Sequence, residues 1–154
     1  MFSRMFKTAT ARIKGGKAYP QIHGMVHFKE MPNGVLVTAK IDGLPQSTSH
    51  CAGRFFGFHI HEGTSCTGNT EDEFANSGSH YNPTHCVHPY HVGDLPPLLE
   101  NKGYAYMRVL VDKLKLQDII GRVIIIHDMP DDFTTQPSGN AGTKIACGKI
   151  MRFR

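Results

Sequence analysis

The segment IHGMVHFKEMPNGVLVTAKID, residues 22–42, decides the class of the fold. In its second half, Val35–Asp42, apolar side chains stand at every second position, which is the period of a strand with one buried face. The first half, Ile22–Glu30, predicts a partner strand. Between the two halves, the pair Asn33-Gly34 is the strongest short-range signal for a β-hairpin in the chain. The segment therefore predicts two antiparallel strands joined by a tight turn.

The same period-two pattern recurs on both sides of this hairpin, and no stretch of a dozen residues holds a helical period. Turns rich in glycine, proline and asparagine separate the segments. Further strands are predicted at Thr10–Lys14, Phe55–His61, Gly103–Val111, Arg122–His127 and Lys144–Met151. Short strands at this spacing predict an all-β protein, an antiparallel sandwich or barrel.

Length and composition restrict the classes of function. The 154 residues correspond to about one domain, expected over residues 1–154 with 1–9 as a loose N-terminal extension. No apolar run approaches the roughly 20 residues of a membrane span, so no membrane partner is expected. The net charge of +4 is too small to indicate nucleic-acid binding, although it favours a small anionic substrate. Because no apolar leader segment is recognisable, we expect an intracellular, cytoplasmic protein.

Two long irregular stretches, residues 62–94 and 128–143, interrupt the pattern of strands. Stretches of this length without regular structure are uncommon in a compact domain unless they have a function. Histidine, cysteine and aspartate residues lie at or near their ends. We therefore expect two long functional loops.

Seven of the ten histidines lie in or beside these loops. His59 and His61 stand two residues apart on a predicted strand, so their side chains share one face. Taken alone, such a pair is as typical of structural histidines as of metal ligands. His127 follows the apolar run 123–126, where it is either a rim residue or a ligand held by a rigid strand.

Residues 80–94 form the densest cluster. They contain four histidines and an aspartate: His80, His85, His88, His91 and Asp94. Imidazole and carboxylate groups suit zinc, and a closed set of four protein ligands is what a structural zinc site requires. Cys86 is able to replace one imidazole, so composition alone leaves the ligand set open.

Taken together, five blocks of sequence resemble the copper/zinc superoxide dismutase family, in the order of that family and from about Ala11 to Ile150. The blocks are GFHIHE (57–62), GSHYNP (78–83), HVGDL (91–95), IGRV (120–123) with His127, and GNAG (139–142) through ACG (146–148). Each block is weak evidence alone, whereas five in order are specific. The resemblance implies a Greek-key antiparallel β-sandwich or flattened barrel that binds copper and zinc.

The resemblance also implies a role for each matching residue. The implied copper ligands are His59, His61, His80 and His127; the implied zinc ligands are His80, His88, His91 and Asp94. His80 thus bridges the two metals. His88 is preferred to His85 because it follows His80 by eight residues, as in the family. Asp131 matches the outer carboxylate that links a copper ligand to a zinc ligand and orients both imidazoles.

The four cysteines allow three complete pairings. Cys66 and Cys147 match the family's intramolecular disulfide, an unusual bond in a reducing cytosol. Cys51 and Cys86 match no family role, and we expect free thiols, with Cys86 as a zinc ligand the lesser alternative.

The activity implied by the resemblance is dismutation of superoxide to oxygen and hydrogen peroxide by a redox-cycling copper. In this scheme His80 releases copper and takes up a proton, and zinc holds His80 in place. The main alternative is a non-catalytic relative that handles copper or serves as an interaction domain on the same fold. All four copper-ligand positions are histidine here, which favours the enzyme.

The chain departs from the family's pattern at several places. Lys144 stands where the family usually has an arginine, so the charge is kept but the planar, multi-donor guanidinium is lost. His88 and His91 are closer together than is usual in the family's zinc loop. The stretch 128–143 is short and lacks the usual lysine–glutamate pattern, and Lys149 replaces an apolar residue near the end of the chain. Because many relatives dimerise near this end, we expect a homodimer.

Overall fold

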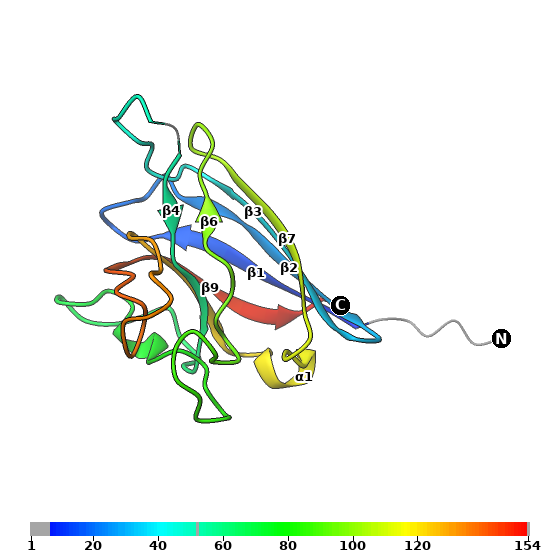
Figure 1. The fold of residues 1–154 in the computed structure, drawn as a ribbon. Coiled ribbons are helices and arrows are strands. Elements are labelled where there is room, and N and C mark those ends of the chain that lie inside the picture. The colour runs from blue at the N-terminus through cyan, green and yellow to red at the C-terminus, as the bar shows by residue number, and fades with distance from the viewer. Residues whose placement is uncertain (1–6, 52, 154) are drawn as a thin grey trace.

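The computed structural model describes residues 7–51 and 53–153. Nearly all of its regular structure is β-strand (Figure 1). The strands are β1 (Thr8–Gly15), β2 (His23–Met31), β3 (Gly34–Asp42), β4 (Phe55–Phe56), β5 (Phe58–His61), β6 (Leu98–Leu99), β7 (Ala105–Val111), β8 (Val123–His127) and β9 (Lys144–Arg152). Two short helical segments complete it: the 3₁₀ turn η1 (Ala75–Ser77) and the helix α1 (Leu116–Ile119).

Seven strands form one curled antiparallel sheet in the order β5-β8-β9-β1-β2-β3-β7, and β4 pairs with β6 in a small second sheet. The consecutive strands β1, β2 and β3 lie side by side, and β9 returns from the far end of the sequence to pair with β1. An order of 9-1-2-3 is the Greek-key arrangement. The predicted fold class is therefore confirmed.

The hairpin of β2 and β3 forms as expected, but its turn lies one residue earlier than the sequence signal. Met31 pairs with Gly34, so Pro32 and Asn33 make the turn and Gly34 is already part of the strand. Gly34 has a φ of +144°, and a Cβ there would lie 2.5 Å from the carbonyl oxygen of Val111 on β7. Glycine is thus required by the close approach of β7 as well as by the backbone conformation.

The core lies inside the curl of the sheet. Alternate side chains of the central strands are fully buried, including Ala11, Ile13, Val26, Phe28, Val37 and Ile41. Phe58 and Ile60 of β5 and Ile124 and Ile126 of β8 enter the same core. The period read from the sequence therefore identifies the buried face correctly.

The main differences from the sequence predictions concern the segment before the first long loop, the start of β1 and two short elements; the remaining strand ends shift by one or two residues. The segment Phe55–His61 is two strands in different sheets, because the chain turns a corner at Gly57. Strand β1 begins at Thr8, so the expected loose extension over residues 1–9 is wrong for its last two residues; residues 1–6 lie outside the described part. The short elements β6 and α1 were not predicted, since neither is long enough to show a period.

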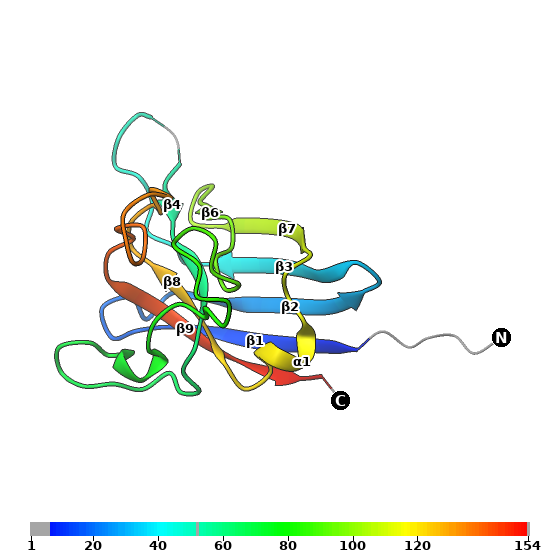
Figure 2. The same ribbon diagram turned by 60° about the horizontal axis from the view of Figure 1, so that its bottom comes forward.

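The two long loops, 62–94 and 128–143, lie toward the same side of the sheet, at the left of Figure 2. A disulfide between Cys66 and Cys147 joins the first of them to β9. Cys147 lies in a small apolar cluster with Phe74, Val123 and Ile125, and Cys66 packs against it. The first loop is therefore fixed to the sheet by a covalent bond and by burial of Phe74.

Replacing both disulfide cysteines by alanine is expected to lower the free energy of unfolding substantially. The disulfide spans 81 residues, and closing a loop of this length stabilises a protein by roughly 4–5 kcal/mol in the chain-entropy account. Urea unfolding of the metal-free protein measures the change. Cys86→Ala is the matched control, because Cys86 is exposed and forms no disulfide. A surface change of this kind alters stability by less than about 0.5 kcal/mol. Equal midpoints for the two variants would contradict the expectation.

Candidate metal centre

Strand β5 supplies the first two imidazoles of the site. His59 and His61 alternate with Phe58 and Ile60, and all four side chains are buried. The two aromatic and aliphatic side chains enter the core, while the two histidines point to the opposite face. His127, at the end of the neighbouring strand β8, brings a third imidazole to this face.

The first long loop is hydrogen-bonded onto the edge of β5, which places its ligands beside those of the strand. An isolated bridge joins His61 to His80, and a second joins His59 to Asp94. The backbone of Tyr81 donates to the carbonyl of Ile60, and that of Ile60 donates to the carbonyl of Gly93. The loop segments around residues 80 and 94 are thereby held like short strands.

These elements bring the predicted residues together in two groups, in each of which the candidate ligand atoms lie within 4.8 Å of one another. The first group contains His59, His61, His80 and His127, and the second contains His80, His88, His91 and Asp94. His80 belongs to both groups. The two sets match those implied by the family resemblance, residue by residue.

In the first group, the hydrogen bonds made by the outer nitrogens leave the inner nitrogens as free lone pairs. His59 Nε2 donates to Asp131 Oδ2 at 2.7 Å, and His61 Nδ1 donates to the carbonyl of Gly78 at 2.8 Å. Their other nitrogens face the centre, where His61 Nε2 lies 3.2 Å from His127 Nε2. His59 Nδ1 and His80 Nε2 are buried without any hydrogen-bond partner. Converging lone pairs with no donor among them fit a cation that prefers imidazole nitrogen, as copper does.

In the second group, three imidazoles surround one carboxylate. Asp94 Oδ1 lies 2.8 Å from His80 Nδ1, and Asp94 Oδ2 lies 3.2 Å from His91 Nδ1. His88 Nδ1 is 3.0 Å from Asp94 Oδ2 but lacks the alignment of a hydrogen bond. A set of three imidazoles and one carboxylate is a four-ligand set of the kind that structural zinc takes.

Asp131 connects the two groups from outside. Its Oδ2 accepts from His59 Nε2 and its Oδ1 accepts from His88 Nε2, both at 2.7 Å. Gly139 permits this contact: it has a φ of +73°, and a Cβ there would overlap with Asp131 Oδ1 and His88 Nε2. The carboxylate therefore fixes the ring orientation of one residue in each group.

Burial keeps the three histidines of β5 and β8 neutral. Desolvation lowers the pKa of His59 to about 4 and that of His127 to about 3, and it holds the pKa of His61 well below its usual range. Burial raises the pKa of Asp131, but the hydrogen bonds from His59 and His88 outweigh it and hold that pKa well below its ordinary value. At neutral pH His59, His61 and His127 are thus neutral imidazoles and Asp131 is an ionised carboxylate, the protonation states that suit a metal centre.

His85 and Cys86, the alternative zinc ligands, lie outside both groups. His85 is exposed and has a φ of +54°, and Cys86 is exposed and makes its contacts with Asn82 and Thr84. Cys51 is likewise an exposed free cysteine. Of the two histidines considered, it is His88 that the structure brings to the cluster.

Two further residues hold the loops in place and were not identified from the sequence. The side-chain amide of Gln136 accepts from the backbone N–H of His88 at 2.9 Å and donates to the His88 carbonyl at 2.8 Å. Arg122 donates to the carbonyls of Glu62 and Asp118, and its guanidinium lies 4.0 Å from the centroid of the Tyr81 ring. Arg122 falls within a recognised block, whereas Gln136 gave no sequence signal.

Lys144, which stands where the family usually has an arginine, is the first residue of β9. Its side chain lines a cavity of about 500 Å³ beside the first group. The same cavity is lined by His61, His80 and His127. The Lys144 ammonium forms an ion pair with Asp72 at 2.9 Å. The structure therefore places the Lys144 cation in the same cavity as the imidazoles, with its charge paired to that of Asp72.

Comparison with known proteins agrees with this geometry. The family model described as copper/zinc superoxide dismutase (SODC) matches residues 22–150. The chain belongs to the copper/zinc superoxide dismutase family. As a member of this family it is an oxidoreductase, and copper and zinc are its cofactors.

Individual relatives cover most of the chain. Superoxide dismutase [Cu-Zn] 2 of Aquifex aeolicus is 32% identical over 84% of this chain and 80% of its own length. The superoxide dismutase [Cu-Zn] of Legionella pneumophila is 34% identical over 85% and 79%. Among solved structures, the Cu/Zn superoxide dismutase from Brucella abortus superposes with a TM-score of 0.78, at 28% identity and over 93% of this chain and 99% of that one. In the described part of the chain, no helix has the length and apolar character needed to cross a membrane.

Asp131→Ala is expected to weaken metal binding at both groups, because it removes the hydrogen-bond acceptor of His59 and of His88 at once. Loss of such an outer partner costs about 10- to 100-fold in metal affinity. Competition with a chromophoric chelator measures zinc and copper affinity separately. Asp42→Ala is the control, since Asp42 is an exposed carboxylate on β3; affinities equal to those of the control would show that Asp131 does not position the ligands.

Proposed function

We propose that this protein converts two superoxide ions and two protons to one oxygen and one hydrogen peroxide molecule. The observation that carries the proposal is that His80 belongs to both ligand groups, with Nδ1 beside Asp94 and a buried Nε2 without a partner. When bound, copper supplies one-electron chemistry between its two oxidation states, and zinc supplies a fixed positive charge without redox chemistry.

The protein's own residues have distinct parts in this proposal. The lone pairs of His59 Nδ1, His61 Nε2 and His127 Nε2 would hold copper, and the tautomers of His59 and His61 are set by Asp131 and Gly78. His88, His91 and Asp94 hold zinc. His80 uses Nδ1 on the zinc side, so its Nε2 is the atom that holds a proton when it is not bound to copper.

Lys144 completes the proposed site as the cation nearest to the anionic substrate. It lines the same cavity as the imidazoles of His61 and His127. A positive group at the mouth of a cleft raises the local concentration of a small anion and its association rate. Its charge also helps to lower the pKa of His127, which places the ammonium within electrostatic reach of the candidate copper ligands.

A homodimer and a cytoplasmic location also remain part of the proposal. Met151, near the end of β9, and Phe153, directly after it, are exposed apolar side chains near the region where dimerisation is expected. Sedimentation velocity of the purified protein tests the dimer, and fractionation of the source cells tests the location.

The protein loaded with one copper and one zinc is expected to dismutate superoxide, whereas protein loaded with zinc alone is not. Pulse radiolysis measures the rate directly. His61→Ala should abolish copper-dependent turnover, and His27→Ala is the matched control, because His27 is an exposed histidine on β2 that belongs to neither group and does not line the cavity beside them. Tight copper binding without turnover in the unmodified protein would support the copper-handling alternative instead.

Lys144→Arg is expected to raise the catalytic rate, by less than about tenfold, which corresponds to less than about 1.4 kcal/mol of transition-state stabilisation. The guanidinium keeps the charge and adds a planar set of donors that suits anion binding. Rates are compared at equal copper content. An unchanged or lower rate would show that lysine is fully adequate at this position.

A further inference from the structure

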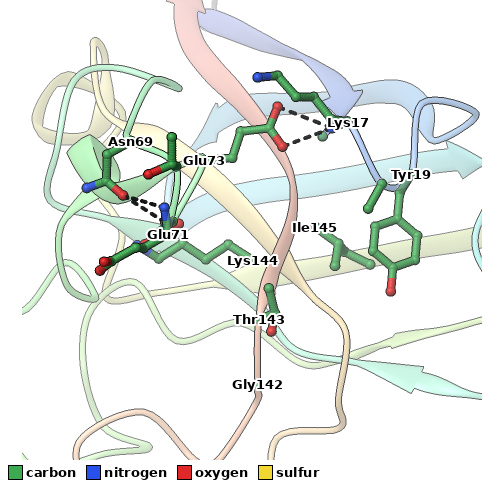
Figure 3. Close-up of a pocket in the computed structure, with 13 residues that line it drawn as sticks. Lys17, Tyr19, Asn69, Glu71, Glu73, Gly142, Thr143, Lys144 and Ile145 are labelled. Atoms are coloured by element: carbon green, nitrogen blue, oxygen red, sulfur yellow. Dashed lines mark hydrogen bonds and ion pairs between the residues drawn. The ribbon is translucent and has the colours of Figure 1, made fainter.

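The ammonium of Lys144 is held by two acceptors from one loop. Lys144 Nζ donates to Asp72 Oδ2 at 2.9 Å and to the carbonyl oxygen of Phe74 at 3.3 Å. Figure 3 shows the side chain extending from β9 toward the loop that carries Asn69 and Glu71. Only 17% of the Lys144 side chain is exposed. A lysine is usually a mobile point charge on a flexible stem, but here its end is fixed.

The carboxylate of Asp72 is itself oriented by the backbone. Its Oδ1 accepts from the N–H of Phe74 at 2.9 Å, which turns Oδ2 toward Lys144. The side chain of Asn69 accepts from the backbone N–H groups of Glu71 and Asp72, both at 2.9 Å. The orientation of the Asp72 carboxylate is therefore fixed by backbone contacts, independently of Lys144.

The loop that carries the two acceptors is anchored on either side. The disulfide of Cys66 ties it to β9, and Phe74 is buried against Val123 and Ile125. The carboxylate of Glu73 accepts from the backbone N–H of Lys17, at 2.9 and 3.2 Å (Figure 3). The acceptors are thus fixed relative to the strand from which Lys144 extends.

A lysine ammonium has three N–H donors. Two of them are directed to Asp72 and Phe74, which leaves one for a ligand in the cavity shared with His61 and His127. We propose that Asp72 is a positioning residue that holds Lys144 in the orientation in which it binds the anionic substrate. These two acceptors, which we call the clamp, give the lysine the fixed direction that an arginine has from its planar fork, although the lysine still offers fewer donors than a guanidinium. This inference rests on the proposed function.

Simple electrostatics predicts the opposite effect of Asp72. A carboxylate 2.9 Å from the ammonium offsets the positive charge that Lys144 brings to the cavity, so its removal should favour anions. Burial raises the pKa of Asp72, but the hydrogen bonds from Lys144 and from the Phe74 N–H, together with the positive charge of Lys144, outweigh it; the pKa lies below its usual value, so the group is ionised at neutral pH. The two accounts therefore differ in the sign of the effect of an Asp72 substitution.

Azide titration of the copper- and zinc-loaded protein separates them, because azide is a small monovalent anion whose binding changes the absorption of copper without turnover. Asp72→Asn should weaken azide binding roughly threefold to tenfold, the cost of ordering one released side chain. Asparagine has an NH2 donor in place of the second carboxylate oxygen, so when its oxygen accepts from the Phe74 N–H it presents a donor to the Lys144 ammonium. Glu71→Gln is the matched control: it removes one charge from the same loop, and Glu71 is exposed and forms no ion pair with Lys144. Its azide affinity should be unchanged or slightly higher.

A rescue variant makes the test specific for positioning. In the double variant Asp72→Asn/Lys144→Arg, the planar guanidinium keeps its donors in a fixed arrangement even though Asp72 no longer holds it. Azide affinity should therefore return to within about twofold of the unmodified protein. Tighter azide binding in Asp72→Asn, equal to that of Glu71→Gln or greater, would overturn the proposal and leave Asp72 as an unfavourable charge. Wild-type affinity in Lys144→Met would overturn it also, since Lys144 would then not bind the anion. Because azide binding does not require turnover, failure of superoxide dismutation in the unmodified protein would refute the proposed function without deciding this test.

Discussion

Strand β5 is buried on both faces, and the rest of the structure follows from that constraint. One face, with Phe58 and Ile60, joins the apolar core, and the other carries His59 and His61. A buried polar group that lacks a hydrogen-bond partner costs about 1–3 kcal/mol. The polar face therefore requires both a cover and a set of partners. The two long loops provide them, which explains why so much of the chain lies outside regular strands.

The loops are positioned by contacts that join segments distant in the sequence. The carboxylate of Asp131 reaches across from the second loop to His59 and His88, and Gln136 forms two hydrogen bonds with the backbone of His88. Arg122 holds the start of the first loop through the carbonyl of Glu62. None of these contacts lies within a strand ladder. The geometry of the centre depends on this network of side chains and on the disulfide, in addition to the sheet.

The strands could be predicted from the sequence because they are marked by a local pattern, whereas the two ligand groups were implied by the family resemblance, since the residues alone left the ligand set open. Val35–Asp42 shows the period of two that places alternate side chains in the core, and the corresponding strand β3 has that buried face. The corner at Gly57 was missed because Phe55–His61 is uniformly rich in strand-forming residues, and only tertiary packing divides it. The contact of Lys144 with Asp72 joins residues 72 positions apart. No pattern within a short window reports such a pair, so the substitution at Lys144 could be seen from the sequence but its partner could not.

Gly57 makes the corner between the two sheets, and its missing side chain has a consequence for the metal centre. A Cβ at this position would lie 2.8 Å from the Cβ of Ala141 and 3.3 Å from both His127 Cβ and His59 Cε1. Three segments therefore pack together at the position where Gly57 has only a hydrogen atom: the corner itself, the end of β8 and the second loop. Any larger residue would have to push the second loop away from the strands or separate two of the imidazoles. The spacing of the histidines is therefore set in part by a residue that contributes no functional group. Only glycine fits at this position without moving the segments around it.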